Sequence, residues 1–361
     1  MRSRIKSLLL KSLLGRFVLG RYSNWRSRRL LQLVQLSTKS ECEKLRALLD
    51  TEQAPIRIFY DNFVSPPAYG EFLQVVMLAR YLKASGAEVS FFIIDDGKRR
   101  VEWEALDLDE QVSLVQDQVE LASKLLDAKI EVLTETSNSS SYIVFGANVL
   151  ARLAIYDKIP LLLNTLIETS EESLPADFLL PIGWGKELEE ELDLQNVPFV
   201  AWNVRKGRWG PDRNNTQEQV ITDFRDIRKL FPSHRIVLLS TPDAIDWVFD
   251  ILLKSGDLHS DTTEEQILFP QPTTGYLNAM LWLLSADEYF QREGGGMGMT
   301  AIFSEVPFLI LSENKGIHYQ HQLDGEKIVA WASPHQRFVH RPLDADRVLF
   351  SDLYARPAEA S

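Results

Sequence analysis

The sequence contains a single cysteine, Cys42, among its 361 residues. One cysteine can form neither an intramolecular disulfide nor a thiolate metal cluster, which favours a reducing, cytoplasmic setting. No apolar run approaches the ~20 residues that span a bilayer. The basic beginning of the chain also lacks the small-residue cleavage site of a signal peptide. We therefore expect neither a disulfide scaffold nor a membrane-spanning protein.

Several motifs of common enzymes are missing as well. No Gly-Lys-Ser/Thr follows the glycines, so a Walker-type phosphate loop is excluded, and no Gly-x-Ser-x-Gly elbow is present. The loop Ser65–Gly70 offers prolines where a Rossmann dinucleotide fingerprint needs glycines. His318 and His321 have no evident third ligand for a metal ion. The sequence thus favours a protein without a metal site or a bound cofactor.

Charge is distributed unevenly along the chain. The net charge is −12, yet residues 1–40 contain ten Lys and Arg and no acid, so the remainder carries −22. An acidic body repels phosphates, which argues against nucleic acid as a partner.

The basic arm, residues 1–50, has leucines between its charges, as in Leu8–Leu10 and Leu13–Leu14. This pattern predicts an amphipathic helix on an anionic membrane surface through residues 1–35, which would make the protein peripheral on the inner face of the membrane. The alternative is a basic helix packed on the acidic body of the same protein.

The length of the chain predicts two domains, because single cores rarely grow beyond roughly 250–300 residues. From Ile56 onward, β-branched runs alternate with helical segments, which is typical of parallel βαβ units. We expect an α/β protein with two Rossmann-like, doubly wound domains facing across a cleft, over residues 51–197 and 198–335. Residues 336–361 are expected to form a C-terminal tail.

The expected elements can be given by range. Strands are predicted at 56–60, 89–94, 130–133, 142–145, 160–163, 199–204, 235–240, 267–269 and 307–311. Helices are predicted at 72–82, 186–192, 217–230, from 242 onward, at 276–284 and at 299–304.

The strongest candidate site is the glycine turn Gly294–Gly298. Consecutive glycines let the backbone approach a ligand closely, and the unpaired N–H groups at the start of a following helix favour an anion. The alternative is a tight turn without a ligand. The candidate binding residues here are Gly294, Gly295, Gly296, Met297, Gly298 and Thr300.

A second candidate lies where the first strand of the second domain ends. Arg205 and Lys206 could neutralise a diphosphate there, with Arg213 close behind. The alternative is a solvated basic loop. Thr241 and Asp243 end the next strand and open a helix, where they could contact a ribose or base, or cap the helix.

In the first domain, Asp61 and Glu71 border the loop after the first strand. Either could act as a general base on an acceptor hydroxyl, if its pKa is suitably raised. The alternative is an ordinary turn or cap role for both carboxylates.

These parts resemble the GT-B glycosyltransferases. The stretch Ala286–Ile310 is similar to their donor site, with Ala-Asp before a strand, a glycine-rich turn, a short helix and a Val-Pro-hydrophobic strand. Asn203–Gly207 is similar to the His-x-Arg-x-Gly motif of the fucosyltransferase-like branch, whose arginine binds the donor diphosphate. Here Asn203 stands in place of the histidine.

The resemblance implies a metal-independent transfer of a sugar from a nucleoside-diphosphate sugar to a saccharide or lipid-linked saccharide, as in polysaccharide biosynthesis. Arg205 and the glycine turn would stabilise the leaving diphosphate. Retaining and inverting chemistry both stay open. Two other interpretations also stay open: a related enzyme (a sugar-nucleotide epimerase or a polysaccharide pyruvyltransferase) and a non-catalytic, membrane-associated scaffold.

Overall fold

The structure is a computed structural model of the chain. It describes residues 43, 56–62, 65, 69–97, 103–104, 106–134, 142–145, 163, 175, 177–181, 184, 198–206, 214–259, 267–268, 276–292, 296–312, 335–340 and 349–354.

The first domain is built on a four-stranded parallel sheet of order β3-β2-β1-β4. Its strands are β1 (Ile56–Asp61), β2 (Val89–Ile94), β3 (Glu131–Leu133) and β4 (Tyr142–Phe145). The connecting helices are α3 (Tyr69–Ala84) and α4 (Leu108–Leu126), which pack against each other.

The second domain has a six-stranded parallel sheet of order β10-β9-β8-β5-β6-β7. The first three strands of this domain lead from β5 to one edge, and the next three lead from β8 to the other, so the sheet is doubly wound. Its strands are β5 (Phe199–Asn203), β6 (Arg235–Leu239), β7 (Ile267–Leu268), β8 (Tyr289–Arg292), β9 (Phe308–Ser312) and β10 (Gln336–His340). Its helices are α8 (Gln217–Leu230), α9 (Pro242–Ser255), α11 (Tyr276–Leu284), α12 (Gly296–Ile302) and α13 (Phe350–Tyr354).

Local sequence explains where these helices begin and end. Capping boxes begin α4 at Asp107 and α8 at Thr216. In each, the cap side chain accepts a hydrogen bond from the backbone N–H three residues later, and the Glu or Gln side chain at that position accepts one from the backbone N–H of the cap residue. Pro242 occupies the first turn of α9, where its missing N–H costs nothing. Gly256 ends α9 with φ of 76°, a left-handed conformation that glycine adopts without strain.

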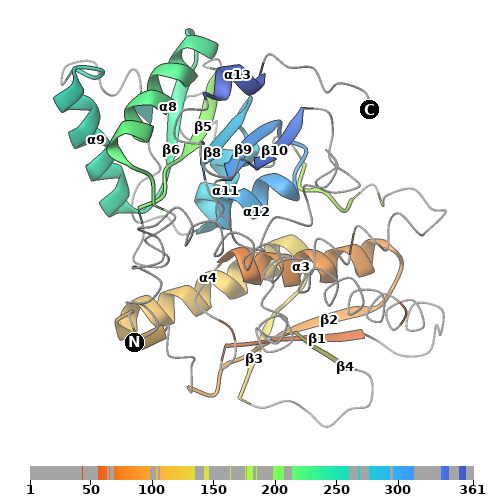
Figure 1. The fold of residues 1–361 in the computed structure, drawn as a ribbon. Coiled ribbons are helices and arrows are strands. Elements are labelled where there is room, and N and C mark those ends of the chain that lie inside the picture. The colour runs from red at the N-terminus through yellow and green to blue at the C-terminus, as the bar shows by residue number, and fades with distance from the viewer. Residues whose placement is uncertain are drawn as a thin grey trace, which may run out of the picture.

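The two domains share one hydrophobic core. A single cluster of buried side chains extends from β1 and α3 of the first domain to α11 and α12 of the second. Phe178 lies between them, with its ring edge-on to both Tyr81 and Phe303. The backbones of Leu180 and Phe303 are hydrogen-bonded as well. Figure 1 shows α3 and α4 between the two sheets, with α11 and α12 facing them.

The expected fold class, two Rossmann-like domains, is confirmed by the two parallel sheets. The second domain extends beyond residue 335, since β10 joins its sheet and Phe350 of α13 is fully buried. Of the strand expected at 160–163, only Leu163 is described, and it is helical. The helix expected at 186–192 lies outside the described residues. No described helix is long and apolar enough to cross a membrane.

Candidate functional site

The candidate site lies at the carboxyl edge of the second sheet. The strand order reverses between β5 and β8, which are direct neighbours with Asn203 opposite Gln291. In an open parallel sheet, the crevice beyond such a switch point is the favoured place for a ligand. β5 leads directly into Arg205, and β8 leads into the glycine turn. The described ends of both strands, Asn203 and Arg292, therefore lie at this switch point, and each motif follows one of these strands along the chain.

The backbone around Arg205 is held in place from two sides. Its N–H donates to Oδ1 of Asn215 at 2.7 Å, and its carbonyl accepts from the N–H of Asn215 at 2.9 Å. On the other side, the amide of Asn203 donates to the carbonyl of Leu239 on β6. Asn203 therefore fastens the end of β5 to β6, a role that its position in the motif did not reveal.

The other polar candidates near this edge have different surroundings. The ammonium of Lys206 lies 4.5 Å from the ring centre of Trp247 on α9, a cation–π contact. Thr241 is the N-cap residue of α9 by position, yet its side chain makes no capping hydrogen bond. Thr241 and Asp243 are both exposed. Arg213 lies outside the described residues.

The glycine segment is described from Gly296 onward, while Gly294 and Gly295 lie outside the described residues. Gly298 is buried where α12 packs on β8. A Cβ added there would lie 2.9 Å from Oε1 of Gln291, whose side chain is fully buried and accepts a hydrogen bond from the hydroxyl of Tyr289. Gly298 thus permits close packing of helix on strand. Met297, beside it, is 8% exposed.

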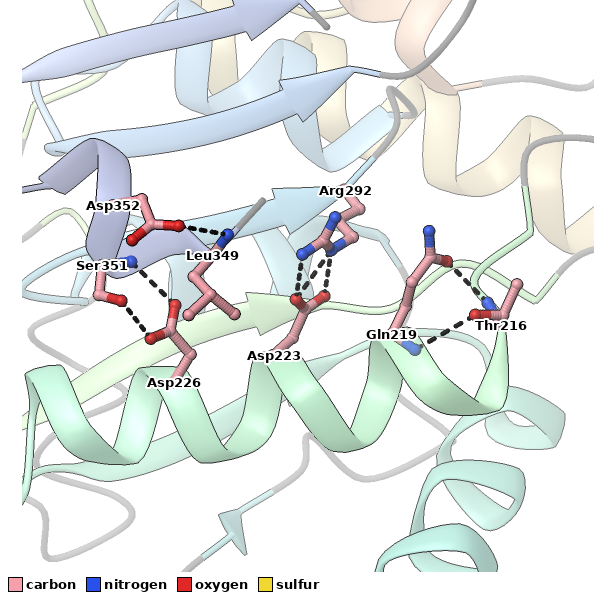
Figure 2. Close-up of polar contacts among 8 residues, drawn as sticks. All are labelled: Thr216, Gln219, Asp223, Asp226, Arg292, Leu349, Ser351 and Asp352. Atoms are coloured by element: carbon pink, nitrogen blue, oxygen red, sulfur yellow. Dashed lines mark hydrogen bonds and ion pairs between the residues drawn. The ribbon is translucent and has the colours of Figure 1, made fainter. Parts of the chain in front are cut away.

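Arg292 ends β8 and is a buried cation. The sequence alone assigns it no role. Its guanidinium donates to both carboxylate oxygens of Asp223 on α8 at 2.7–2.8 Å, and both side chains are 1% exposed. One turn further along α8, Asp226 accepts from the backbone and hydroxyl of Ser351, which anchors α13 (Figure 2). The polar side of α8 therefore fixes the strand end that enters the glycine turn.

The first-domain candidates lie at the carboxyl end of β1 and the start of α3. Asp61 is half-buried, and Glu71 is 8% exposed in the first turn of α3. Their neighbour Asn62 is fully buried and donates to Oε1 of Gln118 on α4 at 3.3 Å. The roles of Asp61 and Glu71 stay predictions.

Two tyrosines join the domains next to these residues. Tyr69, at the start of α3, stacks on Tyr276, at the start of α11, with ring centres 4.2 Å apart and planes 6° from parallel. The Tyr69 hydroxyl donates to Asp117 at 2.5 Å, and the Tyr276 hydroxyl lies 2.9 Å from that of Thr300. Burial raises the pKa of both phenols, so both rings stay neutral at physiological pH. Thr300 is fully buried in this contact.

No family model and no curated protein matches the sequence. Three similar solved structures are the ADP-heptose lipopolysaccharide heptosyltransferase II of E. coli, a family 9 glycosyl transferase of Veillonella parvula, and the UDP-GlcNAc 2-epimerase of Neisseria meningitidis bound to UDP-GlcNAc. Their identities to this chain are 10%, 11% and 13%, and their TM-scores are 0.42, 0.38 and 0.29. The matches cover 79%, 80% and 78% of this chain, and 90%, 86% and 66% of theirs. At these identities and TM-scores, the likeness assigns no ligand to this chain.

Proposed function

We propose that this protein is a glycosyltransferase that moves a sugar from a nucleoside-diphosphate sugar to a saccharide or lipid-linked saccharide acceptor, without a metal ion. One observation supports the proposal: β5 and β8, which the Arg205 loop and the glycine segment follow in the sequence, are neighbouring strands at the switch point of the sheet. A cation and a run of glycine N–H groups on either side of such a crevice suit a diphosphate.

The chemistry follows from where charge develops. As the bond between the anomeric carbon and the diphosphate oxygen breaks, its electron pair stays on the diphosphate. Arg205 and the N–H groups of residues 294–298 would stabilise this charge, and such preorganised groups supply a large part of many rate enhancements. Because Asn215 already fixes the backbone of Arg205, little reorganisation is needed when the donor binds.

The acceptor half-reaction needs a base. The acceptor hydroxyl oxygen forms the new bond to the anomeric carbon, and its proton passes to a carboxylate of the first domain. Asp61 and Glu71 are the two candidates, since both stand at the carboxyl end of β1 or the start of α3, beside the tyrosine contact with the second domain. The fucosyltransferase-like branch is not part of this proposal, because Asn203 holds β6 where that branch has a histidine.

The donor site can be tested by thermal unfolding with a panel of nucleoside diphosphates. At about 100 times its dissociation constant, the right diphosphate stabilises the folded protein by about 2.7 kcal/mol, which raises the unfolding midpoint by several degrees. Arg205→Ala should abolish this rise. The matched control is Arg235→Ala. Arg235 begins β6 and therefore lies at the amino ends of the strands, away from the candidate site, so this variant should keep the rise in the unfolding midpoint.

No rise with any nucleoside diphosphate, or an equal rise for both variants, would refute the donor site. Product analysis then separates the remaining enzyme classes. A transferase joins the sugar to an added acceptor, an epimerase converts the nucleotide sugar without an acceptor, and a pyruvyltransferase requires phosphoenolpyruvate.

The proposal also gives the basic arm a purpose. An acceptor that is linked to a lipid is held at a membrane, and an arm with ten cations and no acid in 40 residues attracts anionic lipid headgroups. We therefore include peripheral binding to an anionic membrane through residues 1–35 in the proposed function.

A further inference from the structure

The outer face of α4 carries exposed apolar side chains. Leu108 is 76% exposed and Val112 is 51% exposed. Val115 and Val119 continue the same stripe, because positions i, i+4, i+7 and i+11 lie on one side of a helix. The adjoining face of α4 buries Leu114, Gln118, Leu121, Ala122, Leu125 and Leu126. The apolar stripe borders this buried face: it is exposed at Leu108 and Val112 and half-buried at Val115 and Val119.

The stripe continues into a groove between α4 and the edge strand β3. We call it the α4–β3 groove: it has a volume of about 510 Å³ and is lined by Val115, Gln116, Val119, Glu120, Ser123, Lys124 and Val132. Val132, on β3, is 46% exposed. A contiguous apolar surface of this kind on a soluble domain marks an interaction site more often than scattered apolar residues do.

The charges around the groove restrict what can occupy it. α4 and its two caps carry five exposed acids and one exposed base: Asp107, Asp109, Glu110, Glu120, Asp127 and Lys124. This rim repels anionic lipid and nucleic acid, and it attracts a segment that is both apolar and basic.

The first 40 residues of the same chain have that chemistry. They contain ten bases and no acid. Leu10, Leu13, Leu14, Phe17 and Val18 have the spacing i, i+3, i+4, i+7, i+8 of one helical face. The segment Leu8–Leu19, which also contains Lys11 and Arg16, is as long in residues as the stripe Leu108–Val119, and each would extend about 17 Å as a helix at 1.5 Å per residue.

The arm can also reach the groove. The described sheet begins at Ile56 of β1, and β3 is two strands away in the same sheet, which is about 10 Å. Residues 41–55 can span up to about 50 Å when extended.

We propose that residues 5–19 of this chain bind the α4–β3 groove, with their leucines on Val112, Val115 and Val119 and their cations on the acidic rim. The apolar face of the arm that would bind the groove is also the face that would insert into an anionic membrane. Binding of the arm to the groove and binding of the arm to lipid therefore exclude each other. In this proposal, the arm occupies the groove when the protein is not bound to a membrane.

The experiment uses cysteine cross-linking in the full chain, because Cys42 is the only native cysteine and can be replaced by serine. The test pair is Leu14→Cys with Val115→Cys. The control pair is Leu14→Cys with Leu253→Cys, because Leu253 is an exposed leucine (43%) on α9 of the other domain. Under mild oxidation, we expect the test pair to close an intramolecular disulfide roughly tenfold faster or more, because docking raises the effective concentration of the two thiols. High salt should slow the test pair alone.

A second substitution separates docking from chance collision. Val112→Lys places a cation on the groove, and since Val112 is exposed, the fold should not change; it should slow closure of the test pair. Leu253→Lys, added to the same test pair, should leave its rate unchanged. Equal closure rates for the test and control pairs would overturn the proposal. So would a disulfide that joins two chains, detected by mass, because it would assign the groove to a second copy.

Discussion

At the scale of single residues, the arginine that ends β8 is the clearest case of a charge that the fold cannot leave unpaired. Arg292 and Asp223 are both about 1% exposed and meet through several contacts of 2.7–2.8 Å. Burying either charge alone costs far more than burying the pair, because the lone ion loses its hydration without a counter-charge. The pair therefore fixes the distance between α8 and the strand that leads into the glycine turn.

We expect Asp223→Asn to lower the free energy of unfolding by about 3–5 kcal/mol, since it leaves the Arg292 guanidinium buried without its counter-ion. Denaturant titration measures this loss. Arg225→Gln is the matched control on the same helix: it breaks an ion pair with Asp257 in which the arginine side chain is 60% exposed, and such pairs contribute little. Losses of equal size in the two variants would mean that burial does not set the value of the Arg292 pair.

Some of these residues can be identified from the sequence and others cannot, for a physical reason. Arg205 could be identified because it directly follows an apolar strand, which is a local signal. Arg292 could not, because its partner Asp223 lies 69 residues away and only the fold brings the two together. Asn203 was recognised as a departure from a motif, but its hydrogen bond to β6 depends on the neighbouring strand.

At the scale of elements, the packing of α12 on β8 depends on a glycine. Glycine inside a helix normally costs about 1 kcal/mol relative to alanine, so Gly→Ala usually stabilises. At Gly298 the sign should be reversed, because the added Cβ would meet Oε1 of the buried Gln291 at 2.9 Å. Oε1 is the end of the Gln291 side chain, so making room for the Cβ means moving a fully buried side chain that is hydrogen-bonded to Tyr289.

We expect Gly298→Ala to destabilise the protein by about 1–3 kcal/mol, the usual range for overpacking. The companion measurement is the same substitution in a Gln291→Ala background, where the obstructing side chain is absent. There Gly298→Ala should cost much less, or should even stabilise. A loss of the same size in both backgrounds would show that a cause other than Gln291 requires the glycine.

The elements themselves were predictable where an apolar pattern marks them. β2, β4, α8 and α11 have the bounds that the sequence predicts, because a nearly continuous apolar run marks β2, β4 and α11 and a helical apolar period marks α8. α4 is not among the predicted helices, although the capping box at Asp107 marks its start in the sequence. β10 and α13 were missed because both follow the apparent end of the last βα unit and are only five residues long.

At the scale of the whole molecule, two features were beyond the reach of sequence reasoning. The sequence predicts two Rossmann-like domains, but it does not show that the described parts of the domains share one core through α3, α11 and α12. An apolar pattern in the sequence predicts that a residue is buried, but it does not predict whether the side chains packed against it belong to the same domain. The opposition of a basic arm and an acidic body is visible in the sequence, but the groove that could receive the arm required the structure.

The membrane proposal makes a prediction about the whole chain. Residues 1–40 carry +10 and the remainder carries −22, so lipid binding must come from the arm, against repulsion by the body. We expect the protein to sediment with anionic vesicles and not with neutral ones. Because each cation near an anionic surface contributes about 1 kcal/mol, replacing Arg26, Arg28 and Arg29 by glutamine should weaken this binding by roughly 100-fold.

The matched control removes the same charge from the body, by replacing Arg225, Lys229 and Lys254, all exposed on α8 and α9, with glutamine. This variant makes the acidic body more negative, so it should lose some binding, but far less than the arm variant, because its charges lie away from the bound surface. If the two triple variants bind alike, net charge rather than the arm governs the association, and the arm has no membrane role. If neither the parent nor the variants bind, the membrane proposal is refuted. Competition between the two sites has its own signature, since adding anionic vesicles should then slow closure of the Leu14→Cys and Val115→Cys pair, while neutral vesicles should not.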